Sequence, residues 1–178
     1  LELDGTGDFV SIETVEDFGF GTANFAVEAW IYPTSTTGTS TIFDFRTGSD
    51  TDEAPRVYQT GGVLKFASAN VEHLSGGSLS LNTWQHVALA RYNGTTRLYL
   101  DGSSVTGAGG DTDNRNYGNT KPLNIGSNYG TVGGDFFTGK IDEVRVSHGT
   151  ARFTSNFTPP SAEYGTAVSY THLTLPTI

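Results

Sequence analysis

The acidic side chains of this sequence are the first candidates for chemistry, and Asp142 is the most informative of them. It lies in residues 135–147, DFFTGKIDEVRVS, the most strand-like run that also carries charge. Side chains two apart on a strand share a face, so Asp142 shares a face with Val144 and Val146. A carboxylate in an apolar core must be paired, hydrogen-bonded or bound to a metal. The pattern therefore predicts either a cation ligand or a structural polar site, in which Asp142 accepts hydrogen bonds from backbone amides or pairs with Arg145 or Arg91.

Two polar loops on either side of one short strand contain the second candidate site. A carbohydrate site needs a flat aromatic ring to stack on a sugar and a few polar groups to fix its hydroxyls. The two loops supply both, and they either meet at one end of a sandwich or lie at opposite ends of the strand that joins them. The alternative is that both are ordinary polar loops. The predicted ligand-binding residues are Tyr117, Tyr129, Asp113, Asn114, Arg115 and Asn128.

Other motifs with known chemistry give weaker signals. Residues 50–53 and 111–114 place oxygen ligands two apart, as calcium loops do, but neither has the full EF-hand pattern, and a solvated acidic loop is the better interpretation. The 4 histidines are far apart in the sequence, and no HExxH, GxSxG or P-loop motif is present.

The elements that would position these residues are short strands bounded by Gly, Asn and Asp clusters. Residues 24–33 alternate as one strand that places Phe25, Val27, Ala29 and Ile31 on one face. Gly61-Gly62 and Asn93-Gly94 each predict a tight hairpin turn. Asn93-Gly94 joins strands 84–92 and 95–100, and Asp101-Gly102 follows one strand later, so the three strands are expected to form an antiparallel meander. Four further aromatic residues are expected in the core or packed on a sheet face, and not as platforms for a sugar: Trp30, Trp84, Phe43 and Phe45. The pattern predicts an all-β sandwich.

The composition of the chain argues against several classes of binding partner. The 178 residues contain 10 Lys and Arg against 19 Asp and Glu, which gives a net charge of −9 and argues against nucleic acid or an anionic membrane as partner. The chain has 0 cysteines, so no disulfide can form. No apolar run is long enough to insert into a membrane, and no signal peptide is present.

Residues 1–165 are expected to form one domain. The chain starts without methionine and is expected to be a piece of a longer protein. Residues 166–178 are interpreted as a non-native or disordered tail. The final SYTHLTLPTI, residues 169–178, resembles a translated sequencing adaptor and is expected to be dispensable; it suggests an assembled environmental sequence.

Five stretches in order resemble the laminin G-like, concanavalin A-like lectin/glucanase jelly roll: LDGTGDFVSI, FAVEAWIYP, WQHVALARYNGTTRLYLDG, LNIGS and FFTGKIDEVRVSHGTARFTSNFTPP. The ending is similar to versions in phage tail or virion proteins and in large secreted bacterial proteins. This resemblance implies a two-sheet antiparallel jelly-roll sandwich. It also implies a structural calcium (Ca2+), with Asp4 on the opening strand and Asp142 on the closing strand as candidate metal ligands.

The resemblance also allows a glycoside hydrolase, but the expected carboxylates are missing. Related enzymes carry Glu-x-Asp-x-Glu or Glu-x-Asp-x-x-Glu on one strand, which places the acids on one side of a cleft. Here Glu2 and Asp4 are followed by Gly5, Thr6 and Gly7, so no third acid is in place, and no catalytic residue is predicted.

The leading hypothesis is a non-catalytic, extracellular or virion-surface module that binds a glycan or polysaccharide on a cell surface. The alternative is a structural or protein–protein module of a tail fibre or adhesin that packs on neighbouring domains of its parent protein. An exposed hydrophobic patch or a stable trimer would favour the alternative. A glycoside hydrolase is the third possibility.

Overall fold

The computed structural model describes residues 1–48, 51–107, 109–128 and 134–162. Tyr129 and the predicted tail, residues 166–178, lie outside these ranges. No helix of the described residues is long and apolar enough to cross a membrane.

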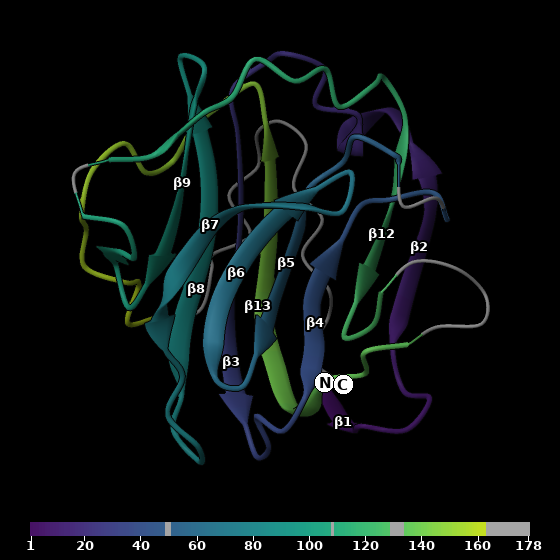
Figure 1. The fold of residues 1–178 in the computed structure, drawn as a ribbon, viewed down its shortest axis with the longest axis vertical. Helices are drawn as coiled ribbons and strands as arrows, with labels where there is room; N and C mark the ends of the chain where they lie inside the picture. The colour runs from purple at the N-terminus through teal and green to yellow at the C-terminus, as the bar shows by residue number, and fades with distance from the viewer. Residues whose placement is uncertain (49–50, 108, 129–133, 163–178) are drawn as a thin grey trace.

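Two antiparallel sheets lie one over the other and enclose a single large core (Figure 1). The all-β, two-sheet jelly-roll prediction is confirmed. Sheet A has the order β1 (Glu2–Asp4), β13 (Thr138–His148), β3 (Phe25–Pro33), β8 (Gln85–Tyr92), β9 (Thr95–Leu100) and β10 (Ser103–Ser104), with β11 (Asp111–Thr112) also on β9. Sheet B has the order β2 (Val10–Val15), β12 (Lys121–Ile125), β4 (Thr39–Asp44), β5 (Arg56–Thr60), β6 (Val63–Ser68) and β7 (Val71–Ser78). A short 3-10 helix, η1 (Glu16–Phe18), follows β2.

The predicted strand and turns are confirmed. The inward side chains of β3 are Phe25, Val27, Ala29 and Ile31, all fully buried in the core. Asn93 and Gly94 have φ angles of 47° and 71°, the left-handed values that a type I′ turn between β8 and β9 requires. Asp101 and Gly102, at 49° and 76°, turn β9 into β10 in the same way, which completes the predicted meander.

The predicted orientation of Asp142 is wrong, because β13 contains a bulge. Asp142 pairs with Trp30 and Arg145 with Glu28, so two residues of β13 oppose one residue of β3. Glu143, one of the two, has a φ of 51°. The bulge shifts the alternation by one residue. Ile141 is therefore in the core with the two valines, whereas Asp142 is half-buried on the outer face of sheet A.

Residues after β13 cross the outer face of sheet A as a strap. Phe153 and Phe157 stack on each other with ring centroids 3.7 Å apart and pack on a small cluster that includes Tyr99. Beneath them, His86 Nε2 lies 3.0 Å from a carboxylate oxygen of Glu28, and both residues are fully buried. The strap thus covers the buried contact between His86 and Glu28 and turns part of an outer sheet face into a second core.

Replacing Phe157 with Ala is expected to lower the free energy of unfolding by about 2 kcal/mol, less than for a fully buried Phe because the ring is half-buried. Urea denaturation measures this loss. The control is Thr154→Ala, an exposed residue of the same strap, which should change the free energy by less than about 0.5 kcal/mol. Equal effects of the two substitutions would show that the strap is not packed as described.

Candidate functional site

The loop before β12 supports the fold from inside, which corrects the prediction that Asp113 and Tyr117 contact a ligand. Tyr117 is fully buried and Asp113 is 2% exposed. The Tyr117 hydroxyl donates to Asp113 Oδ2 at 2.7 Å, and Thr96 Oγ1 donates to the same oxygen at 2.5 Å. Burial and the Asp113 carboxylate raise the pKa of Tyr117, so its hydroxyl remains a donor.

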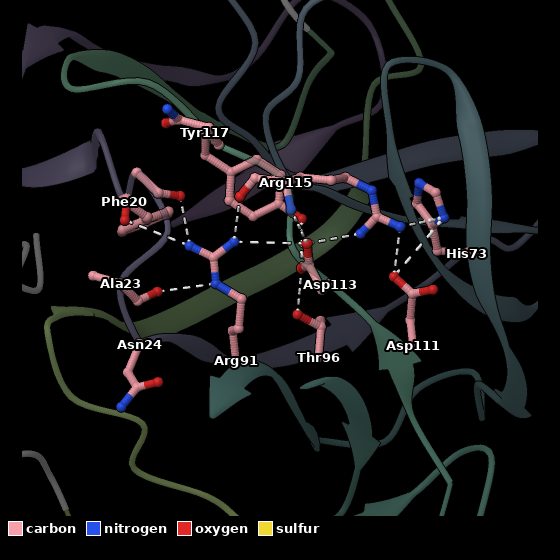
Figure 2. A network of polar contacts seen from close by, with 12 residues as sticks. Phe20, Ala23, Asn24, His73, Arg91, Thr96, Asp111, Asp113, Arg115 and Tyr117 are labelled. Atoms are coloured by element: carbon pink, nitrogen blue, oxygen red, sulfur yellow. Dashed lines mark hydrogen bonds and ion pairs between the residues drawn. The ribbon is translucent and has the colours of Figure 1, made fainter. Parts of the chain in front are cut away.

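Arg91 is at the centre of this buried network (Figure 2). Its guanidinium donates to the carbonyl oxygens of Ala23 at 2.9 Å, Gly21 at 2.7 Å and Arg115 at 2.9 Å, and its Nη1 lies 3.6 Å from Asp113 Oδ1. Burial lowers the pKa of Arg91, but an arginine remains charged. One cation therefore holds together two loops that are about ninety residues apart in the chain.

The other described residues of the predicted carbohydrate site, on the loops before and after β12, do not come together. Asn114 is exposed, and Arg115 is half-buried with its guanidinium on Asp111 at 2.6 Å. Asn128 follows β12, whereas Asp113 and Arg115 precede it, so the two loops lie at opposite ends of that strand. The sequence left open whether the two loops meet at one end of the sandwich or lie at opposite ends of the strand, and the structure has them at opposite ends.

The two predicted calcium ligands lie on paired strands but do not form one site. Asp4 pairs with Thr138, so four residues of β13, about 13 Å, separate it from Asp142. Asp4 Oδ1 accepts hydrogen bonds from the backbone N–H and the hydroxyl of Thr6, at 2.7 and 2.8 Å, which lower the pKa of Asp4. Asp142 Oδ1 accepts the backbone N–H of Glu143.

Within the described ranges, no group of three or more His, Asp or Glu side chains could hold a metal ion. Asp4 and Asp142 do not fit a shared calcium ion, and calcium binding remains an untested prediction.

The outer face of sheet B gathers polar side chains that the sequence did not single out. Thr41 pairs with Tyr58 and Asp44 with Arg56, and the partners of each pair project to the same face, away from the core. Four ion pairs lie on or beside this face: Arg46 with Asp44, Arg56 with Asp135, Lys65 with Glu72, and Lys121 with Asp52. These ion pairs contain 4 of the 10 Lys and Arg side chains of the chain, whose net charge is −9.

Arg56 organises the centre of this face. Its Nη2 donates to Thr41 Oγ1 at 2.7 Å and to Asp135 Oδ2 at 2.5 Å, and Asn128 Nδ2 donates to the same carboxylate oxygen at 3.2 Å. The guanidinium carbon lies 4.5 Å from the centroid of the Tyr58 ring. We call the surface formed by Thr41, Arg56, Tyr58, Asn128 and Asp135 the Arg56 face.

The residues of the Arg56 face differ in exposure. Thr41 and Arg56 are buried, whereas Tyr58, Asn128 and Asp135 are partly exposed. Burial is the largest cause of the raised pKa of Tyr58, followed by the charge of Glu72, so the Tyr58 hydroxyl is neutral and can donate. The face therefore offers one aromatic ring, one hydroxyl, one amide and one carboxylate, held by a guanidinium that is fixed from two sides.

Asn128 is the one residue of the predicted carbohydrate site that lies on the Arg56 face. The alternation of Arg56, Tyr58 and Thr60 with Val57 and Gln59 was visible in the sequence as a polar side of one strand. Asp135 could not be assigned in this way, because it reaches Arg56 from a loop 79 residues further along the chain.

Comparisons with known proteins agree with this fold. Residues 4–152 match the laminin G type model of the concanavalin A-like lectin/glucanases superfamily. Among curated proteins, none matches the sequence.

Three solved structures show the same fold. A pentraxin from Limulus polyphemus has a TM-score of 0.61 and 16% identity, over 82% of this chain and 73% of that one. A putative carbohydrate-binding protein from Bacteroides ovatus has a TM-score of 0.61 and 23% identity, over 86% and 45%. Domains LG4-5 of mouse laminin α1 have a TM-score of 0.59 and 13% identity, over 91% and 46%. The chain spans less than half the length of the last two.

Replacing Asp142 with Ala is expected to lower the free energy of unfolding by about 1 kcal/mol, the size of one hydrogen bond. A buried ligand or ion pair would cost several kcal/mol. Urea denaturation with and without added calcium distinguishes the two cases, and a large loss that appears only in calcium would restore the metal-ligand interpretation.

Replacing Asp113 with Ala is expected to cost about 3–5 kcal/mol, because Arg91 and Arg115 would lose a buried carboxylate. Tyr117→Phe removes one buried hydrogen bond and should cost about 1–2 kcal/mol. Thermal unfolding can be compared with that of the exposed neighbour control Asn114→Ala. A loss of less than 1 kcal/mol for Asp113→Ala would contradict a supporting role.

Proposed function

Because the chain belongs to the concanavalin A-like lectin/glucanases superfamily, we propose that it is a non-catalytic carbohydrate-binding module that uses the Arg56 face. The observation that carries the proposal is the grouping of Tyr58 with Arg56, Asp135 and Asn128. An aromatic ring beside fixed donors and acceptors is the combination that a sugar requires. The similarity to the putative carbohydrate-binding protein of Bacteroides ovatus supports the general class of ligand.

We assign each group of the Arg56 face a role in binding. The apolar side of a sugar ring packs against Tyr58, whose position is fixed by the guanidinium 4.5 Å from its centroid. Ring hydroxyls donate to the Asp135 carboxylate and accept from the Asn128 amide. Thr41 and Asp135 hold Arg56 in place, so little side-chain entropy is lost when the ligand binds.

The ion pairing of the cations on or beside this face favours a neutral glycan. Each of the four cations on or beside the face already has a carboxylate within an ion-pair distance. An anionic sugar would have to displace one of these carboxylates, whereas hydroxyl groups can share the existing donors and acceptors. We place the module outside the cell or on a virion surface, where such glycans occur on a neighbouring cell.

No hydrolysis is part of the proposal. Asp135 is paired with Arg56, and Asp44 is paired with Arg46 at 2.7 Å. General-acid catalysis of glycoside cleavage needs a carboxyl group that can hold a proton, with a second carboxylate opposite it. Asp135 and Asp44 each have an arginine, and not a second carboxylate, as ion-pair partner.

Replacing Tyr58 with Ala is expected to weaken glycan binding by about tenfold or more, since one aromatic contact contributes roughly 1–2 kcal/mol. The experiment is a glycan and polysaccharide array, with and without EDTA, followed by calorimetry on the strongest ligand. Tyr92→Ala removes an exposed tyrosine at the far end of β8 and is the control.

Wild-type affinity in Tyr58→Ala would place the ligand elsewhere and overturn the assignment of the Arg56 face. A folded protein that binds no glycan on the array would favour the structural or protein–protein alternative. Size-exclusion chromatography and sedimentation would then test for a stable oligomer.

A further inference from the structure

The outer face of sheet A is covered over only part of its area. Its side chains come from alternate positions of β3, beginning with Ala26 and Glu28, while the intervening residues face the core. Phe153 and Phe157 of the strap cover the part formed by Ala26, Ala88, Ala90 and Tyr99. The other end of β3 adds Trp30 and Tyr32, which are only half-buried.

Trp84 lies beside Tyr32 at the uncovered end. It is 42% exposed, and its ring centroid is 5.5 Å from that of Tyr32, with an angle of 57° between the ring planes. Trp30 is on the same face, where its ring contacts His86 at 5.4 Å. Two neighbouring rings, tilted toward each other and open to solvent, form a shallow aromatic surface, which we call the Trp84 platform.

We propose that the Trp84 platform, formed by Tyr32 and Trp84, is a second carbohydrate-binding site on the sheet opposite the Arg56 face. The class of ligand is a neutral oligosaccharide. The site goes beyond the proposed function, because it uses different residues on the other sheet and could bind a sugar even if the Arg56 face did not.

The exposed area of the platform argues for a sugar as the occupant. A tryptophan side chain presents at most about 250 Å², so Trp84 at 42% exposure offers about 100 Å². Tyr32, the other ring of the platform, is half-buried and offers less. The sum is well below the roughly 800 Å² per partner that a stable protein interface buries, but it is comparable to the face of one or two sugar rings.

Polar groups border the aromatic rings where a sugar would place its hydroxyls. Asp142 pairs with Trp30 across the sheet, and Lys140 pairs with Tyr32. The Lys140 side chain is 47% exposed, and its ammonium group lies 3.9 Å from the Glu2 carboxylate. An aromatic centre with opposite charges at its edge matches a ring that has one apolar side and hydroxyls around its rim.

Two sites on opposite sheets would change how the module engages a surface. A single domain could bind two strands of a polysaccharide or two neighbouring chains. Binding to a multivalent glycan would then be tighter than to a short oligosaccharide, because the second contact is intramolecular.

The chain has 2 tryptophans, Trp30 and Trp84, and both are on this face, so tryptophan fluorescence reports on the proposed site. The probes are the hexasaccharides of β-1,4-glucose, β-1,4-xylose, β-1,4-mannose and β-1,4-N-acetylglucosamine. We expect at least one to shift the emission to shorter wavelength and to reduce quenching by acrylamide. Calorimetry should show affinity at least tenfold lower in Trp84→Ala and partly retained in Trp84→Phe, which keeps a flat ring.

Two controls separate this site from the Arg56 face. Tyr58→Ala should keep the fluorescence shift, and Tyr92→Ala, a tyrosine 43% exposed elsewhere, should bind as the wild type does. A shift that disappears in Tyr58→Ala would overturn the second site and leave the Arg56 face as the binding site. The absence of a shift with all four probes would overturn it as well. Self-association that Trp84→Ala removes would assign the platform to a second copy of the chain instead.

Discussion

The two-residue alternation of side chains across each strand decides which residues of this domain can meet a ligand. In β5, Val57 points into the core, while Arg56 and Tyr58 point away from it. In β3, Ile31 is in the core and Tyr32 is on the opposite side. Both proposed sites depend on this alternation, because Tyr58 and Tyr32 are outward residues of strands whose inward residues form the core. Residues outside the strands complete each site.

Ion pairs allow the outer face of sheet B to carry charged groups at low exposure. Asp44 is fully buried and Arg46 is 2% exposed, yet each is the partner of the other. Arg56 is shared between Thr41 and Asp135. Such pairs contribute little net stability once desolvation is counted, but they hold their atoms in fixed positions. A preorganised polar surface is more useful for recognition than for stability.

The sequence predicted the fold better than the site. Asn93-Gly94 and the alternation of residues 24–33 are local signals, and both elements formed as expected. The predicted orientation of Asp142 is wrong because one extra residue in β13 reverses the alternation of its side chains. No residue pattern in the sequence indicates that bulge. Asp113 and Tyr117 have the composition of a ligand-binding loop, but long-range contacts with Arg91 and Thr96 bury them. These misassignments have one physical cause: burial depends on contacts between residues far apart in the sequence.

Amide chemical shifts recorded during a glycan titration test the central claim most directly. The account predicts that the largest changes in a 15N-labelled sample fall on residues 56–58, Asn128 and Asp135 as the ligand saturates. Changes confined to residues 111–117 would contradict it, because they would place the sugar on the loop that we assign to structural support.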